Sequence, residues 1–427
     1  MITAIGSYLP PWHGAGRSRA AGPDEDAVTL AVAAGRVALR AAAEAGQPRG
    51  PGQPRGPGQP RGARHDGTAP GPGHVSVAPV PVERVVLVSR DLPLLEGGNA
   101  AVLLAGLDLP PGIEVVERLG GAPAALDALL GAPGATLVIG SDVRDGAGAA
   151  AAMTGTRGGT ATPLARLHRS LPLRVRTDDG EVHEDRDPRL ARERGVRASL
   201  QGAGLPGKPA ALPGLHQREA APFCEGDPPD LPTVGASAAL FALAALAERR
   251  ASGLVAAVEQ ATVVAAGWEP TGTAVGREEP PARDLPARRS TPGAPMRIAL
   301  TAYDRAFDAK VRWQAGRCPA CGSLSFPPRY RCAACGSEEV CALEPLPRTG
   351  SVYTATTVHL EVPGLASPYS LALVDLDGVA LRALVHVTDT PPGTVDVGDR
   401  GRLVLRRVAT RNGVPDYGYA FSPEQVG

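Results

Sequence analysis

Four of the six cysteines in this 427-residue chain stand in two short pairs that could bind a metal ion. The first pair is Cys318-Pro-Ala-Cys321-Gly and the second is Cys332-Ala-Ala-Cys335-Gly, with ten residues between them. A two-residue gap lets both thiolates of a pair face one ion, and the glycine lets the backbone turn its amides towards sulfur. The spacing therefore predicts a structural zinc ion held by all four cysteines, because a closed tetrahedral site leaves no position for a substrate.

The main alternative for these cysteines is redox chemistry, since Cys-x-x-Cys also occurs in thiol oxidoreductases. Two pairs, each followed by glycine, favour zinc. The first residues, MITAIGSYLPPW, lack the basic start and long apolar stretch of a signal peptide, so we expect a cytoplasmic protein. Cysteines in that compartment bind metals more often than they form disulfides. Cys224 and Cys341 stand alone and receive no role.

The charge balance argues against a protein that obtains its affinity from nucleic-acid phosphates. Lys plus Arg and Asp plus Glu number 44 each, so the net charge is zero. Nucleic-acid-binding domains usually carry a basic patch instead. The longest apolar run, near Ser237–Ala247, is about half the length of a membrane span. The composition thus predicts a soluble protein with no membrane partner, and it disfavours nucleic acid as a ligand.

The first 275 residues have the pattern of a layered α/β domain, because predicted strands and helices alternate. Residues 46–73 interrupt this pattern with a Pro/Gly-rich low-complexity repeat that predicts an extended loop. The segments Leu173–Arg176 and Glu181–Glu184 suit a hairpin, and Leu254–Ala265 suits two strands. The other predicted strands are Met1–Ser7, Arg84–Ser89, Ile113–Glu117, Ala135–Gly140 and Ala149–Thr154, and the predicted helices are Asp24–Glu44, Asn99–Gly106, Ala122–Leu130 and Gly235–Arg250.

The segment after the cysteine pairs reads as five short strands separated by Pro, Gly and Asp turns. Five strands in about 80 residues favour a small closed Greek-key barrel of the OB type, with a β-sandwich as the alternative. The predicted strands are Gly350–Leu360, Tyr369–Asp375, Val379–Val387, Gly401–Ala409 and Tyr417–Phe421.

The last 115 residues contain several separate specific motifs. They are W-x-x-G-R-C-P-x-C-G, F-P-P-R and C-x-x-C-G-S between Trp313 and Ser337, followed by TGSVYTATTV, PYSLALVDLDG and DYGYAFSP. Together these motifs resemble an acyl-CoA-associated family that joins a rubredoxin-like zinc ribbon to an OB-fold. The resemblance implies that the chain works beside thiolase-fold enzymes, where it would bridge subunits or hold the CoA end of an acyl thioester.

Four segments of the N-terminal part carry a second resemblance: ITAIGSYLP, EDAVTLAVAAGRVAL, LVIGSDVRDGAGAAAAMTG and VGASAALFALAALAE. They resemble the thiolase fold of hydroxymethylglutaryl-CoA synthase and ketoacyl synthase III. That family carries a nucleophilic cysteine at the N-terminus of a buried helix, where the helix dipole lowers the thiol pKa and backbone amides stabilise an oxyanion. Here the cysteine position falls on Leu119, and Thr233 and Val234 stand where an asparagine is expected. His216 stands where a catalytic histidine could lie, but a surface or capping role is the stronger interpretation.

A condensing enzyme cannot form its acyl-enzyme without a nucleophile, so the resemblance implies a degenerate thiolase domain. The acidic residues around Asp178–Asp187 could form an acid/base set, yet the interleaved arginines favour a solvated hairpin. We therefore predict a thiolase-like layered αβαβα domain (1–275), a linker (276–296), a helix with the zinc ribbon (297–345) and an OB-fold (346–427).

Three functions remain open at this point. The first is an accessory, acyl-CoA-binding protein that assembles with a thiolase-type acyltransferase, synthase or aldolase, as a homo- or hetero-oligomer in lipid-related metabolism. The second is an enzyme that performs hydroxymethylglutaryl-CoA synthase-like condensation or retro-aldol cleavage without the cysteine, for which His216 or Tyr303 are the candidates. The third is a nucleic-acid-binding barrel that stacks bases on Tyr353, Tyr369, Tyr417 and Tyr419.

Overall fold

The computed structural model describes the chain in eight stretches, which are residues 1–16, 18–46, 80–95, 98–185, 187–289, 299–339, 341–361 and 366–424. Nearly all of the predicted Pro/Gly-rich loop (46–73) and the end of the predicted linker (276–296) lie outside these residues. No helix in the described part combines the length and the apolar surface that crossing a membrane requires.

The larger sheet of the N-terminal domain has six strands in the order β13-β1-β7-β6-β4-β5. Strand β7 runs antiparallel to both of its neighbours, and the other neighbouring pairs are parallel. Both faces of β6 and β7 are buried, which explains their continuous runs of small and apolar residues. The strands are β1 (Ile2–Tyr8), β4 (Arg84–Ser89), β5 (Glu114–Leu119), β6 (Thr136–Asp142), β7 (Gly148–Thr154) and β13 (Ala274–Glu278).

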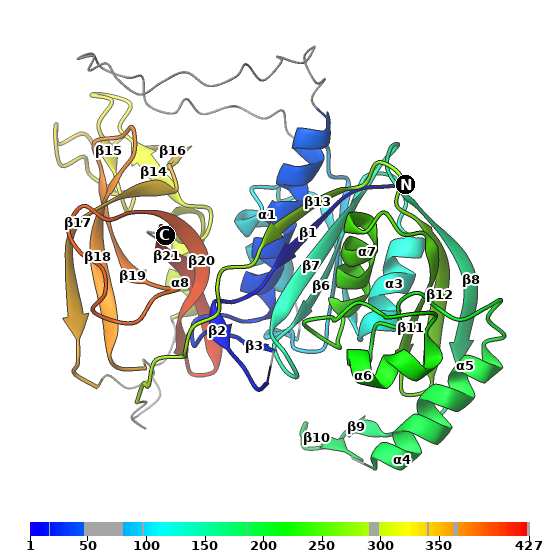
Figure 1. The fold of residues 1–427 in the computed structure, drawn as a ribbon. Helices are drawn as coiled ribbons and strands as arrows, with labels where there is room; N and C mark the ends of the chain where they lie inside the picture. Colours follow the sequence, from blue (N-terminus) through cyan, green and yellow to red (C-terminus); the bar gives the residue numbers. More distant parts are fainter. Residues whose placement is uncertain are drawn as a thin grey trace, which may run out of the picture.

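A smaller sheet and three sets of helices complete five layers (Figure 1). Helices α3 and α7 lie between the sheets, α1 covers the outer face of the larger sheet, and α5 lies against the smaller one. The predicted αβαβα arrangement is therefore confirmed. These elements are α1 (Ala27–Gly46), α2 (Asn99–Gly106), α3 (Ala122–Leu130), α5 (Ala198–Gly202), α7 (Ala238–Glu248), β8 (Thr160–His168), β11 (Gly253–Glu259) and β12 (Thr262–Glu269), with sheet order β11-β12-β8.

Shorter elements decorate this core. A hairpin of β9 and β10 forms where the sequence predicts one, with Val182 paired to Arg176. The remaining elements of the domain are β2 (Trp12–His13), β3 (Arg19–Ala20), β9 (Arg174–Arg176), β10 (Val182–Glu184), α4 (Pro188–Leu190), the π-helix η1 (Ala191–Arg197), α6 (Gln217–Ala220) and the 3-10 helix η2 (Ala221–Phe223).

Two strands of the layered sheets were not expected from the sequence. Strand β8 contains Pro163 and lies at the edge of its sheet next to an irregularity in register, where proline is tolerated. Strand β13 lies in a segment rich in Pro and Arg, yet it pairs in parallel with β1 and continues the larger sheet to Glu278. The predicted boundary at residue 275 therefore falls inside a strand.

The C-terminal part consists of helix α8 (Leu300–Lys310), a small three-stranded sheet and a closed barrel. The small sheet has the order β15-β14-β16, and the barrel closes in the order β17-β18-β19-β21-β20. All five predicted barrel strands are present. The strands are β14 (Gln314–Arg317), β15 (Leu324–Ser325), β16 (Ala342–Pro345), β17 (Thr349–Val358), β18 (Tyr369–Leu376), β19 (Arg382–Val387), β20 (Arg400–Arg411) and β21 (Val414–Pro423).

The barrel packs against the N-terminal domain through β20, which contacts α1 (Figure 1). Buried side chains of α1, the larger sheet, the ribbon and the barrel belong to one continuous apolar cluster. Trp313, at the start of the ribbon, contacts the rings of Phe326 and Tyr419 at centroid distances of 4.6 and 5.1 Å. The ribbon, the barrel and the thiolase-like domain therefore share a core.

Candidate functional site

The four paired cysteines converge at one point of the ribbon. Their sulfur atoms all lie within 4.8 Å of one another, and the Cys318–Cys335 and Cys321–Cys332 sulfur pairs are each 3.7 Å apart. Four sulfurs bound to zinc at about 2.3 Å form a tetrahedron with edges of about 3.8 Å. The cluster therefore has the size of a tetrahedral four-thiolate zinc site.

Both cysteine pairs have the same backbone geometry, which explains the repeated glycine. Gly322 and Gly336 have φ angles of 72° and 76°, a region that side chains with a Cβ rarely adopt. Each glycine amide donates to the carbonyl of the first cysteine in its pair, over 2.8 Å to Cys318 and 2.9 Å to Cys332. The two turns thus aim their thiols at a common centre.

Ser323 lies beside these sulfurs, and its hydroxyl is 3.2 Å from the sulfur of Cys332. The Ser323 hydroxyl and then the backbone amides of Cys335 and Ala334 lower the pKa of Cys332 to about 6. The pKa of Cys335 is raised instead, because the amide of Ser337, which lowers it, is outweighed by the neighbouring thiols and by burial.

Cys341 lies outside the four-sulfur group. Cys224 is buried in the N-terminal domain, and burial raises its pKa to about 11, which makes it a poor nucleophile.

The N-terminus of α3 is the place where the resemblance puts a nucleophile. Leu119 ends β5 with 69% of its surface exposed, and the helix begins three residues later, at Ala122 after Gly121. Instead of a thiol, the carboxylate of Glu259 approaches the helix: it accepts the Gly121 amide at 3.1 Å and pairs with Arg90. An internal ion pair therefore takes the anion-binding end of this helix.

The N-terminus of α7 is closed in the same way by Asp142 at the end of β6. Its buried carboxylate accepts the amides of Ala236 at 2.7 Å and Ser237 at 2.8 Å, and the Ser237 hydroxyl at 2.6 Å. A Cβ on Gly235 would lie 1.9 Å from this carboxylate, so the glycine of the Gly-Ala-Ser motif makes the close approach possible. Thr233, at the expected asparagine position, is buried and contacts the Ser237 hydroxyl at 2.7 Å.

Glu259 and Asp142 therefore hold equivalent positions. Each ends a strand, and each carboxylate caps one of the two helices between the sheets. Backbone amides that could stabilise an oxyanion are thus occupied by carboxylates of the chain itself. Sequence reasoning missed both residues, because single acidic residues after a strand carry no motif; the one available signal was the Gly-Ala-Ser sequence.

The other candidate residues do not gather into one site. His216 is exposed at the start of α6, where its own amide donates to Glu219 at 3.3 Å. The acidic residues of the β9–β10 hairpin are exposed as well. Tyr303 lies on α8, close to the barrel rather than to His216. Tyr417 and Tyr419, considered as base-stacking residues, are buried, so the expectation that they are available to nucleic acid is wrong.

A buried ionic cluster joins the barrel to the N-terminal domain, and sequence reasoning missed it. The guanidinium of Arg406 in β20 donates to Asp389 at 2.9 and 3.0 Å and to the hydroxyl of Tyr8 at 3.1 Å. Tyr8 in turn donates to Glu25 at 2.7 Å. Burial raises the pKa of Glu25 to about 7, although Arg406 opposes this shift. These residues form a buried, hydrogen-bonded polar cluster inside the interface between the barrel and the N-terminal domain.

A second contact fixes the start of α1 to the barrel. Asp26 caps this helix by accepting the amides of Val28 at 3.1 Å and Thr29 at 3.0 Å. Its other carboxylate oxygen accepts the hydroxyl of buried Tyr417 at 2.8 Å. One side chain thus serves both a helix end and the domain interface.

Two family models match the C-terminal part of the chain. One describes the rubredoxin-like zinc ribbon domain of ChsH2 and covers residues 312–340; the other describes the C-terminal OB-fold domain of ChsH2 and covers residues 343–406. Both matches fall on the elements described above, since the first contains the four cysteines and the second contains most of the barrel.

The chain is also similar to curated proteins over about the same length. It is 32% identical over 111 residues to a DUF35 domain-containing scaffold protein of Methanocaldococcus jannaschii, which is 25% of this chain and 78% of that protein. It is 33% identical over 106 residues to the benzoylsuccinyl-CoA thiolase subunit BbsA of Thauera aromatica, which is 25% of this chain and 72% of that subunit.

Among solved structures, the 3-oxoacyl-acyl-carrier-protein synthase III of Aquifex aeolicus matches with a TM-score of 0.42 and 17% identity. The match covers 63% of this chain and 99% of that chain.

Proposed function

Because the chain belongs, through its zinc ribbon and barrel, to the family of ChsH2-type proteins, we propose that it is an accessory subunit of a thiolase-fold enzyme. In this role it assembles with an active acyltransferase, synthase or aldolase and holds the acyl-CoA thioester beside it. The thiolase-like domain supplies structure rather than catalysis. Relatives that are named as a scaffold protein and as a thiolase subunit support this assignment.

The observation that carries the proposal is that Glu259 occupies the N-terminus of α3. A condensing enzyme of this type needs a nucleophile at that helix end and free amides for the oxyanion. Here the stretch from Leu119 to Ala122 offers no nucleophilic side chain, and Glu259 occupies the amide of Gly121. An accessory role fits these residues better than covalent acyl transfer.

Zinc has a structural part in this function. Cys318, Cys321, Cys332 and Cys335 would hold the ion, and four protein sulfurs leave no open coordination position for a substrate. The ion would therefore fix the ribbon against the barrel through the shared core around Trp313. Thiolate ligands persist in a reducing compartment, so we place the protein in the cytoplasm.

Purification of the tagged full-length chain from its native host, followed by mass spectrometry, tests the assembly. We expect a thiolase-fold protein with an intact catalytic cysteine to copurify in a fixed ratio. The isolated chain, incubated with acyl-CoA thioesters of several lengths, should show no turnover, and activity should appear only with the partner.

Two results would contradict this function. Turnover of an acyl-CoA by the isolated chain would favour the cysteine-independent enzyme, and the His216→Ala variant would then show whether that histidine takes part. Recovery of nucleic acid that stays bound as the salt concentration rises would favour the third function instead.

A further inference from the structure

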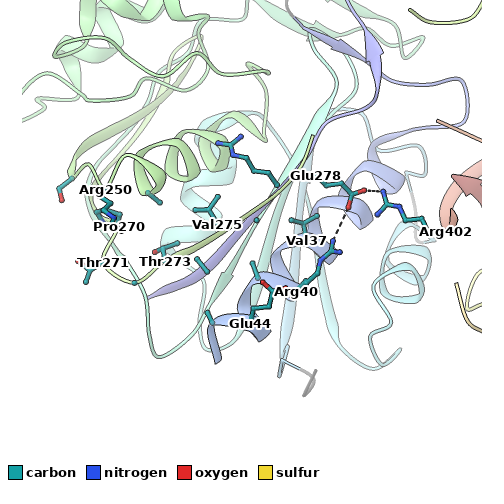
Figure 2. Close-up of a pocket in the computed structure, with 18 residues that line it drawn as sticks. Val37, Arg40, Glu44, Arg250, Pro270, Thr271, Thr273, Val275, Glu278 and Arg402 are labelled. Carbon is teal, nitrogen blue, oxygen red and sulfur yellow. Dashed lines mark hydrogen bonds and ion pairs between the residues drawn. The ribbon is translucent and has the colours of Figure 1, made fainter. Parts of the chain in front are cut away.

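An extended groove lies where the barrel meets the N-terminal domain. Its outer part, of about 1240 Å³, runs along the free edge of β13 between α1 and the end of α7 (Figure 2). Its inner part, of about 380 Å³, continues between α1 and β20. Arg40, Glu278 and Arg402 line both parts, so the two cavities adjoin. Both domains therefore contribute to one groove.

Positive charge exceeds negative charge along the inner part. Asp108 pairs with two guanidinium groups, at 2.8 Å from Arg36 and 2.6 Å from Arg348. Glu278 also faces two: it pairs with Arg402 and lies 3.5 Å from Arg40 (Figure 2). Four guanidinium groups thus share two carboxylates. The surplus charge creates a positive potential that attracts anions into the groove.

Two of these arginines can reach a ligand. Arg40 is 56% exposed and Arg402 is 44% exposed, and both face the groove. A guanidinium presents five N–H donors in a planar fork that matches phosphate oxygens in two-point contacts. Since one carboxylate cannot satisfy both forks, each retains donors for a bound anion.

Apolar side chains also line the inner part of the groove. They come from the same two elements as the arginines: Val32 and Ala33 from α1, and Leu403 and Leu405 from β20. A free inorganic ion would leave these side chains without a contact, whereas an organic phosphate could place its less polar body against them.

We propose that this groove binds a phosphate-bearing organic anion of the nucleoside diphosphate class, with its phosphates on the N–H donors of Arg40 and Arg402 that Glu278 leaves free. Coenzyme A and a free nucleotide share this chemistry. The coenzyme A version rests on the proposed acyl-CoA function, whereas the anion site itself does not.

Calorimetric titration of the full-length chain tests the site with coenzyme A, ADP and inorganic pyrophosphate as probes. We expect at least one organic probe to bind more tightly than pyrophosphate, with an affinity that falls as salt screens the arginines. Replacement of both groove arginines, Arg40→Gln with Arg402→Gln, should weaken binding by a factor of about ten or more, because two charge-assisted contacts are lost. Arg40→Gln alone should give part of this loss.

A matched control lies on the same strand. Arg400 is 54% exposed and pairs with Asp377, but it does not line the groove, so Arg400→Gln should leave the affinity unchanged. Thermal unfolding of each variant identifies a loss of folding, and the exposed single variant Arg40→Gln keeps the test valid if the double variant unfolds.

The outcomes separate the groove from the proposed function. If coenzyme A binds the original chain and the double variant equally, the groove is not the binding site, and acyl-CoA binding is still supported. If ADP binds and depends on Arg40 while coenzyme A does not bind, the groove stands and acyl-CoA binding fails. Failure of all three probes to bind at low salt overturns the groove. Assembly with a thiolase-fold partner is read independently by copurification.

Discussion

At the residue scale, two carboxylates decide what the thiolase-like domain can do. Asp142 and Glu259 accept backbone amides at the N-termini of the two central helices. The helix dipole favours a negative charge there, whether it comes from a side chain or from a reaction intermediate. Here the chain's own carboxylates accept these amides, and each contributes to the stability of its helix.

Asp142→Asn should destabilise the protein by about 2 kcal/mol, because a neutral amide loses charge-assisted bonds and turns an N–H group towards amide donors. Chemical denaturation measures the change in unfolding free energy. The matched control is Asp145→Asn, three residues further on, where the side chain is exposed and the same substitution should have little effect. Equal stability of both variants would show that the cap on α7 contributes nothing.

At the scale of elements, the ribbon is the part of the chain that depends most on a ligand. Its three strands are two to four residues long, and the two Cys-x-x-Cys-Gly turns place polar loops around the sulfurs. Such short strands bury little apolar surface, so the ribbon depends on bonds to a metal ion for stability that a hydrophobic core would otherwise supply. Trp313 joins this element to the barrel, and its indole N–H donates to the carbonyl of Pro347 at 3.0 Å.

The purified chain should contain one zinc ion, measured by atomic emission. Cys335→Ser should lower the zinc content to below about a tenth, because loss of one thiolate opens the closed site. Strong chelation should also unfold the ribbon and change the tryptophan fluorescence, since Trp313 lies at its base.

Cys341→Ser provides the control, because this cysteine lies outside the four-sulfur group and its loss should leave zinc in place. A metal-free chain whose ribbon remains folded would contradict the site.

At the scale of the whole molecule, the barrel and the thiolase-like domain form one unit. Arg406, Tyr8, Glu25 and Asp389 meet inside the interface, and removal of one partner would leave an unpaired charge there. The barrel is therefore held in one orientation, which keeps the groove between the two domains in a fixed shape.

Glu25 should make this interface sensitive to pH. Its pKa of about 7 in the folded protein lies above the ordinary value of 4.5, so the folded state holds the proton more tightly than the unfolded state does. Stability should consequently fall as pH rises from about 4.5 to about 7, by about 3 kcal/mol for a shift of this size.

The variant Glu25→Gln should lack this decline, so that its stability relative to the original protein rises with pH across the same window. Thermal or chemical unfolding at several pH values provides the comparison, with Glu44→Gln at the exposed end of α1 as the control. If Glu25→Gln and the original protein show parallel pH profiles, the carboxyl group is already charged at low pH and the buried cluster is a simple ion pair.

Elements with strong local signals could be predicted from the sequence. The geometry of the two cysteine turns follows from the Cys-x-x-Cys-Gly sequence, since the glycines adopt positive φ angles. Helices α2 and α3 and strand β4 have the predicted bounds, because helical and strand periodicities depend on local side-chain patterns. The closed order of the barrel agrees with five alternating strands.

The contacts between distant side chains could not be predicted from the sequence and are seen only in the folded chain. Glu259 reaches Gly121 across 138 positions of sequence, and Arg406 reaches Tyr8 across 398. The same holds for β13, which lies at the start of a Pro- and Arg-rich stretch without a strand pattern but pairs with the first strand. Partners so far apart are brought together by the burial of whole layers, a free energy that is spread over many side chains and leaves no mark at the residues that finally touch.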